Sequence, residues 1–316
     1  MEIINVYHTP VMLHEAVSAL LPEKSGGIYV DLTLGGGGHS RELLKRMQSD
    51  ARLLGFDQDT DAMVNAPVDE RFTFVWSNFR YLRNWLTFYG IERVDGILAD
   101  LGVSSHHFDE GARGFSFRFP EEPLDMRMNR NAALTAAQVL NTYSVEELCR
   151  IFSLYGELKG VYRLATAIDK ARGQKPLCIM SDLIEVVSPL LPARRERKEL
   201  TKLMQALRIE VNKELDSLQD LLSQVSDVLN PDGRLVVLTY HSLEDRLVKN
   251  QIKTGNLEGK ITKDLYGRRL HAPLSPIAPF PASPSEEEQE RNPRSRSAKL
   301  RVAELTVHNL SVGVNC

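Results

Sequence analysis

Four consecutive glycines, Gly35 to Gly38, lie in the sequence DLTLGGGGH at residues 31–39. Backbone N–H groups in such a turn can bind polar or anionic ligands, because a helix that starts there presents the positive end of its dipole. Glycine also lets a ligand approach the backbone closely, since it has no side chain. A tight turn needs fewer glycines, so we expect this run to bind a nucleotide-like ligand.

The residues around the glycines narrow the choice of ligand. A P-loop requires a lysine after its last glycine, whereas His39 and Ser40 follow Gly38 here. A dinucleotide site requires a third spaced glycine, and Ser40 occupies that position. Asp57 follows RLLGF near the distance expected for an acid that binds ribose hydroxyls. Such an acid suits a dinucleotide as well as S-adenosylmethionine, so both ligands remain open here.

Two further residues lie where strands end. Asp100 ends the stretch DGILAD, and in a doubly wound sheet this strand lies beside the first one, at the edge where ligands bind. A carboxylate there can accept a hydrogen bond from an amine, which suits methyl transfer to nitrogen; the alternative is an ordinary helix N-cap. Phe79 follows the third strand, where its ring can contact an adenine or simply join the core.

Alternating strands and helices must position these residues. The apolar stretches at residues 26–35, 51–59, 72–79 and 94–105 predict strands, and the periodicity at 11–21 and 39–47 predicts helices. Strand–helix alternation indicates a parallel sheet covered on both faces. We therefore predict an α/β doubly wound fold.

From residue 130 to 203 the sequence predicts helices alone. They are expected at 135–140, 145–156, 163–172 and 181–191, before one long helix at 200–229 that NPDG ends. Strands are expected again at 234–242 and 301–307. The simplest organisation is one α/β domain, 1–129 and 204–316, interrupted by a helical insert at 130–203. A middle domain with a function of its own is the alternative.

The composition of the 316 residues is that of a globular protein. The net charge is −3, so a polyanionic partner would have to bind local basic patches. The three cysteines lack metal-site spacing, and we expect reduced thiols and no metal. No apolar run is long enough to span a membrane, and the N-terminus lacks a signal-peptide pattern. We expect a cytoplasmic protein without a membrane partner, and its oligomeric state, monomer or homodimer, stays open.

Two regions carry candidate RNA-binding cations, and Arg127 is a further single candidate. The stretch 271–297 contains six prolines and runs of both charges, which predicts an exposed or disordered loop. A run of basic residues lies at 193–200, in the predicted insert. The candidates are Arg127, Arg194, Arg195, Arg197, Lys198, Arg294 and Arg296. The ordinary alternative for such runs is a solvated face.

Several ordered motifs together resemble one family. They are YHTPVML (7–13), DLTLGGGGHS (31–40), DGILADLGVSS (95–105), RGFSF (113–117), PLDMRMN (123–129), QALRIEVNKEL (205–215), YHSLEDRLVK (240–249) and NPRSRSAKLR (292–301). These closely resemble the bacterial RsmH (MraW) family, which are S-adenosylmethionine-dependent methyltransferases of small-subunit ribosomal RNA. The resemblance implies a Rossmann-like class I methyltransferase with a helical insert, and N4-methylation of a cytidine in the decoding region of 16S rRNA.

The resemblance also implies the cofactor contacts. Gly37, Gly38 and His39 form the glycine loop, Asp57 binds ribose, Phe79 lies along the cofactor and Asp100 closes the corner at the fourth strand. The chain departs from the family pattern at His106 and His107, which replace a proline and a cofactor-contacting glutamine. Asn129 replaces an aspartate, and Tyr240 stands where phenylalanine is common.

Methyl transfer from a sulfonium depends mainly on alignment of the nucleophile, the methyl group and sulfur. A cytosine amine is a weak nucleophile, so a hydrogen-bond acceptor would assist it. Asp100 is the first candidate for this role and His241 is the second, with a structural role as the alternative for His241. The competing functions are a dinucleotide-dependent oxidoreductase and a non-catalytic RNA-binding factor of ribosome assembly.

Overall fold

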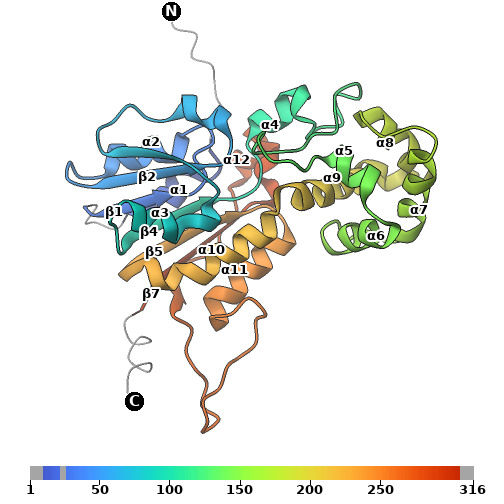
Figure 1. Cartoon of the computed structure of the whole chain (residues 1–316). Coiled ribbons are helices and arrows are strands. Elements are labelled where there is room, and N and C mark those ends of the chain that lie inside the picture. The colour runs from blue at the N-terminus through green and yellow to red at the C-terminus, as the bar shows by residue number, and fades with distance from the viewer. Residues whose placement is uncertain (1–9, 22–25, 307–316) are drawn as a thin grey trace, which may run out of the picture. The chain divides into compact units, whose positions relative to one another are not determined.

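A computed structural model describes residues 10–21 and 26–306 of the chain. The chain divides into two compact units (Figure 1). The first, which we call the sheet unit, comprises Met1–Gly102 and Leu215–Cys316. The second, the helical unit, comprises Val103–Glu214. Within the described residues, none of the helices is both long and apolar enough to traverse a bilayer.

The sheet unit contains seven strands in the order β3-β2-β1-β4-β5-β7-β6. Their bounds are β1 Ile28–Asp31, β2 Arg52–Asp57, β3 Phe72–Trp76, β4 Val94–Asp100, β5 Leu229–Thr239, β6 Leu274–Pro276 and β7 Lys299–Leu305. The first five in this order are parallel, whereas β7 pairs antiparallel with β5 and with β6. The predicted doubly wound α/β fold is confirmed.

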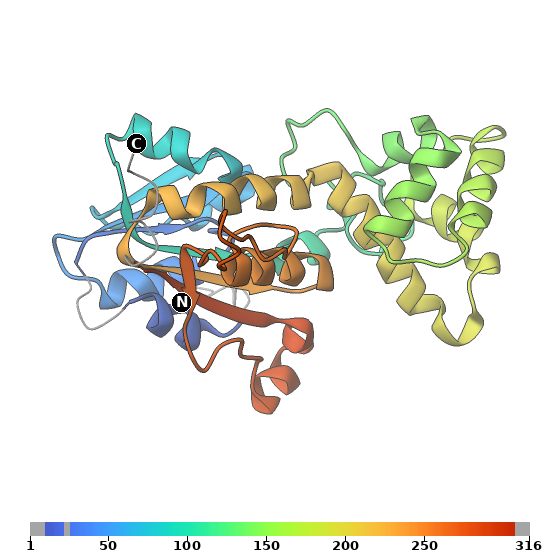
Figure 2. The same cartoon turned by 90° about the horizontal axis from the view of Figure 1, so that it is seen from below.

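Both faces of the sheet are buried. Its helices are α1 Leu13–Leu20, α2 Gly38–Arg46, α3 Leu82–Phe88, α10 Glu214–Val228, α11 Ser242–Thr254 and α12 Glu286–Arg291. Consecutive strand residues point to opposite faces: Tyr29 packs in the core with α1 and α2, and Val30 in the core with α3, α10 and α11. Figures 1 and 2 show α10 and α11 on the same side of the sheet. Such burial explains why the strands are short apolar runs.

The helical unit has a core of its own. Its helices are α4 Ser105–Asp109, α5 Ala136–Thr142, α6 Val145–Leu154, α7 Val161–Arg172, α8 Met180–Val187 and α9 Glu196–Asn212. This core also includes Phe115, Leu124 and Met126, which precede the predicted insert, and Leu207 and Val211, which follow it. The unit therefore extends beyond the expected range 130–203 at both ends, because these apolar side chains pack with the insert's helices.

The expected long helix at 200–229 is two helices. Lys213 separates α9 from α10 and has a left-handed backbone, with φ 50°. The NPDG sequence does not precede β5 but lies within it, and Asp232 there has φ 63°. The sequence predicts one continuous helix because the helical spacing of apolar residues continues through Lys213. A single residue with left-handed backbone does not change that spacing.

The stretch 271–297 is more ordered than expected. It contains β6, α12 and the 3₁₀ helix η6 Pro293–Ser297. Ser285 caps α12 through its hydroxyl, and β6 completes the sheet edge against β7. The prolines predicted loop structure because they cannot extend a helix or a central strand, but they are compatible with these short elements.

Candidate active site

The glycine run makes a tight turn between β1 and α2. Gly35 and Gly37 have φ of 49° and 73°, in the left-handed region that favours glycine. A side chain on Gly37 or Gly38 would also collide with neighbouring atoms. A Cβ on Gly38 would lie 2.1 Å from Pro10 Cγ, and one on Gly37 would lie 2.6 Å from the Asn65 carbonyl oxygen. These glycines are required by the turn, which directs the first N–H groups of α2 along the carboxyl edge of the sheet.

Asp57 at the end of β2 fixes the turn. Its Oδ2 accepts the Gly35 N–H at 2.8 Å, and its Oδ1 accepts the Asp59 N–H at 2.9 Å. Burial raises the pKa of Asp57 to about 6, despite these two hydrogen bonds. Each carboxylate oxygen has a second lone pair, so the site can also accept hydrogen bonds from ribose hydroxyls.

A buried network links the turn to β1. Asp31 accepts the Ser40 hydroxyl at 2.6 Å and the Thr33 N–H at 3.1 Å. Burial raises the pKa of Asp31, and burial lowers the pKa of His39. Asp31 and Ser40 were not predicted from the sequence as site residues; an acid at the last position of a buried strand was the available signal.

Asp100 lies at the end of β4, which pairs with β1 as expected. Its N–H donates to Thr33 Oγ1 at 2.7 Å, and its Oδ2 lies 3.8 Å from His39 Nδ1. The Tyr240 hydroxyl donates to Asp100 Oδ1 at 2.7 Å. Burial, together with the Asp100 carboxylate, raises the pKa of Tyr240 well above its usual range. Tyr240 is therefore a neutral donor that orients Asp100.

From the sequence, Tyr240 is only a departure from the phenylalanine that is common at this position. Its position directly after β5 was the signal for a role in the site, because β5 and β4 are neighbours and Asp100 pairs with Leu238. The hydroxyl that distinguishes tyrosine from phenylalanine is the atom that bonds Asp100. This chain thus has a site contact that the common residue cannot make.

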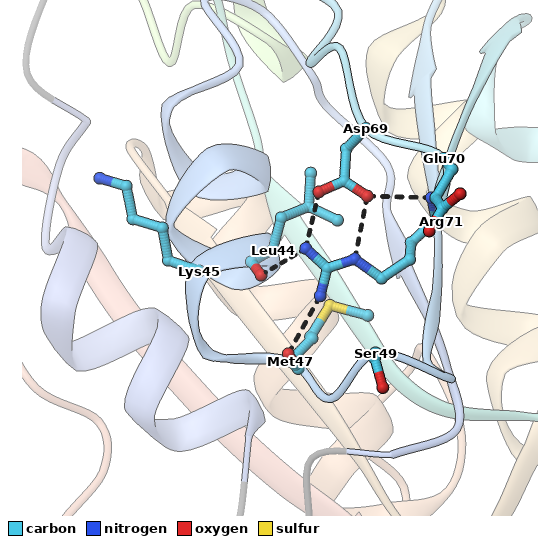
Figure 3. A pocket seen from close by; sticks show the side chains of 7 residues that line it. All are labelled: Leu44, Lys45, Met47, Ser49, Asp69, Glu70 and Arg71. Atoms are coloured by element: carbon cyan, nitrogen blue, oxygen red, sulfur yellow. Dashed lines mark hydrogen bonds and ion pairs between the residues drawn. The ribbon is translucent and has the colours of Figure 1, made fainter.

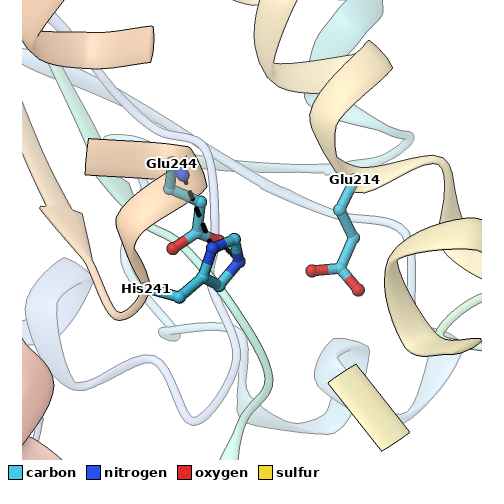
Figure 4. Close-up of side chains that lie close together, drawn as sticks. All are labelled: Glu214, His241 and Glu244. Atoms are coloured by element: carbon cyan, nitrogen blue, oxygen red, sulfur yellow. Dashed lines mark hydrogen bonds and ion pairs between the residues drawn. The ribbon is translucent and has the colours of Figure 1, made fainter. Parts of the chain in front are cut away.

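His241 caps α11. Its Nδ1 accepts the Glu244 N–H at 3.5 Å, and its Nε2 lies 3.2 Å from Glu244 Oε1 (Figure 4). Glu244 also accepts the Tyr240 N–H at 2.9 Å. These contacts favour the structural role that the sequence left open for His241, and a catalytic role stays a prediction.

Phe79 begins the 3₁₀ helix η2 Phe79–Tyr81, directly after β3. Its ring is partly buried and packs against the core that α3 and α10 share. Asn78 precedes it and donates to Gln58 Oε1 at 2.9 Å, which ties this loop to the end of β2. The contact of Phe79 with an adenine stays a prediction.

His107 and Arg127 belong to the helical unit. His107 lies in α4, where its Nδ1 accepts the Ser104 N–H at 3.2 Å and its ring lies 4.8 Å from that of Phe115. Arg127 donates to both Asp125 oxygens and to the carbonyls of Arg130 and Ala132. The Arg127 guanidinium is thus used within the unit, so the structure favours a loop-stabilising role for this residue.

The other predicted cations are exposed. Arg194 and Arg195 lie in η5 Ala193–Arg195, and Arg197 and Lys198 lie in the first turn of α9. The Arg197 guanidinium lies over the Phe117 ring, 5.8 Å from its centroid. Arg294 and Arg296 are exposed on η6 of the sheet unit. The structure therefore places these groups on two separate units.

A shallow hollow beside the C-terminal end of α2 has a structural explanation. Arg71 lines it and donates to both Asp69 oxygens and to the carbonyls of Leu44 and Met47 (Figure 3). These contacts anchor the end of α2, whose beginning forms the glycine turn. We therefore do not consider this hollow a second active site.

The strand order, with its antiparallel β7, and the site at the carboxyl edge of β1, β2 and β4 define a Rossmann-like class I methyltransferase. The model of the MraW methylase family matches residues 5–306, and the chain belongs to this family. Its methyl donor is S-adenosylmethionine. The site fits that cofactor, because the partly buried Asp57 carboxylate lies against the glycine turn and keeps lone pairs for ribose hydroxyls. Membership of this methylase family excludes the alternative of a dinucleotide-dependent oxidoreductase.

Curated relatives match nearly the whole chain. Ribosomal RNA small subunit methyltransferase H of Phocaeicola vulgatus is 57% identical over 299 residues, 95% of this chain and 97% of the relative. The protein of the same name from Bacteroides thetaiotaomicron is 56% identical, with 94% and 97% covered. A third, from Christiangramia forsetii, is 48% identical, with 96% and 99% covered.

Proposed function

We propose that this enzyme methylates N4 of a cytidine in the decoding region, at the P site, of 16S ribosomal RNA in the small subunit. The observation that carries the proposal is the Asp100 carboxylate, which lies at the centre of the carboxyl edge and is oriented by Tyr240. The relatives named ribosomal RNA small subunit methyltransferase H support the choice of substrate.

The chain's residues act mainly by alignment. Bound S-adenosylmethionine supplies an activated methyl group on a sulfonium. Gly37, Gly38 and His39 would hold its amino-acid end, Asp57 its ribose, and Phe79 its adenine. Holding two reactants in line can supply roughly 7–11 kcal/mol of the barrier.

Asp100 is the acceptor that we propose for a proton of the cytosine amine. A hydrogen bond from that amine localises its nitrogen lone pair, and a positioned acceptor contributes about 10²–10⁴-fold to a rate. Its Oδ1 already accepts from the Tyr240 hydroxyl, so rotation of the carboxylate would break that hydrogen bond. The base must leave its stack to reach this edge.

The test uses small subunits that lack the modification, radiolabelled S-adenosylmethionine and nucleoside analysis of the digested RNA. We expect the label to co-migrate with N4-methylcytidine, and Asp100→Asn to reduce its formation by about 10²-fold or more. Label in another nucleoside would contradict the proposed position. His241→Ala serves as the comparison: a loss of turnover with unchanged folding would restore His241 as a catalytic candidate.

A further inference from the structure

A hairpin extends from the sheet unit between α11 and β6. It comprises residues 255–273, which we call the arm, and Figure 1 shows it as the orange connection that leaves the body of the unit. The arm is paired internally: Lys263 and Arg269 form an antiparallel bridge, and the Leu270 N–H donates to the Thr262 carbonyl at 2.9 Å. Its conformation is therefore defined by its own hydrogen bonds.

The tip of the arm is built around Asp264. Its Oδ1 accepts the N–H groups of Tyr266 at 2.9 Å and Arg268 at 2.8 Å, and its own N–H donates to the Arg268 carbonyl at 2.8 Å. This turn holds two large apolar side chains in solvent, with Leu265 102% and Tyr266 85% exposed. Two adjacent apolar side chains held in solvent by a fixed turn offer a surface to an interaction partner.

The charges of the arm favour an anionic partner. Lys263, Arg268 and Arg269 are exposed, and in the described part of the chain no carboxylate pairs with them. The nearby acids are occupied: Asp264 accepts from the turn, and Glu258 pairs with Lys260. The arm therefore concentrates positive charge on a protein whose net charge is −3.

One pair of side chains favours RNA over other anionic partners. The Arg268 guanidinium lies over the Tyr266 ring, 5.7 Å from its centroid. Single-stranded nucleic acids bind where an aromatic ring stacks on a base and cations contact the adjacent phosphates. We propose that the arm binds single-stranded RNA, with Tyr266 stacked on a base and Lys263 and Arg268 at phosphates. This inference rests on the proposed function and extends it to a second surface of the same unit.

The test is the affinity of the full-length protein for a fluorescent single-stranded oligouridine. Stacking on an aromatic ring tolerates any base, so the result does not depend on which nucleotide is methylated. Tyr266→Ala should weaken binding about tenfold. The matched control is Tyr162→Ala, because Tyr162 is 70% exposed on α7 and lies outside the arm. The double variant Lys263→Ala with Arg268→Ala should make the negative slope of log affinity against log salt less steep by about 1.4, about 0.7 for each lost phosphate contact.

All variants should bind S-adenosylhomocysteine as the unchanged protein does, which shows that the site is folded. Failure of the unchanged protein to bind oligouridine, or equal affinity of Tyr266→Ala, would overturn the inference. Vesicles that contain phosphatidylserine are the second probe: arm-dependent vesicle binding with unchanged RNA affinity would assign the arm to a membrane surface instead.

Discussion

At the residue scale, one hydroxyl determines the position of the site's central carboxylate. Tyr240→Phe removes only the oxygen that donates to Asp100 at 2.7 Å. Hydrogen bonds to charged groups contribute about 1.5–3 kcal/mol. The family resemblance implies that Asp100 also contacts the cofactor, so we expect S-adenosylhomocysteine to bind about tenfold more weakly by calorimetry. Tyr143→Phe is the control, since it removes a similar 2.8 Å bond to Glu210 in the helical unit. Equal losses in the two variants would refute a specific role for Tyr240.

Ionisation of Asp57 lowers the stability of the folded protein, which is a second effect at the scale of a single residue. Its pKa is raised from 3.8 to about 6 by burial. The folded protein therefore binds the proton more tightly than the unfolded chain, and the free energy of unfolding falls as pH rises between these values. Two pKa units correspond to about 3 kcal/mol. In denaturant titrations between about pH 4 and 8, the free energy of unfolding of Asp57→Asn should fall less than that of the unchanged protein, by up to about 3 kcal/mol. The variant should also bind S-adenosylhomocysteine more weakly. Parallel curves of unfolding free energy against pH for the two proteins would contradict this prediction.

At the scale of elements, the sequence predicted the strands and their parallel pairing, because both follow from the periodicity of apolar residues and the order of the elements. The four strands around Asp57 and Asp100 follow from short apolar runs, and their parallel pairing follows from the helices between them. The break at Lys213 could not be predicted, because left-handed backbone at one residue does not alter apolar spacing. The same limit applies to Arg71, whose contacts with the end of α2 join residues 24 and 27 positions apart.

The arm shows a second limit at this scale. Its residues are polar, glycine-containing and of mixed charge, which is typical of an ordinary connection between α11 and β6. Only the structure shows that the Asp264 carboxylate accepts a backbone hydrogen bond of the turn and that Arg268 lies over Tyr266. Composition counts the charges of a segment, but the recognition of RNA depends on which of those charges remain unpaired.

At the scale of the whole molecule, RNA binding must overcome a net charge of −3. Each unit has exposed cations: the arm in the sheet unit, and the basic run at 194–198 in the helical unit. If one RNA contacts both surfaces, their contributions to the salt dependence add, because each phosphate contact releases its own counterions. Attraction then comes from local patches, as the sequence indicated.

Small ribosomal subunits allow a direct test of this additivity. Alanine at Arg194, Arg195, Arg197 and Lys198 should lower the slope of log affinity against log salt by about 0.7 for each phosphate that is no longer neutralised, and the arm variant Lys263→Ala with Arg268→Ala should add its own decrease. The combined protein should show the sum. Lys159→Ala with Lys170→Ala removes two exposed charges elsewhere on the helical unit and should leave the slope unchanged. A combined decrease no larger than that of one patch would mean that the two surfaces bind RNA alternatively, not together.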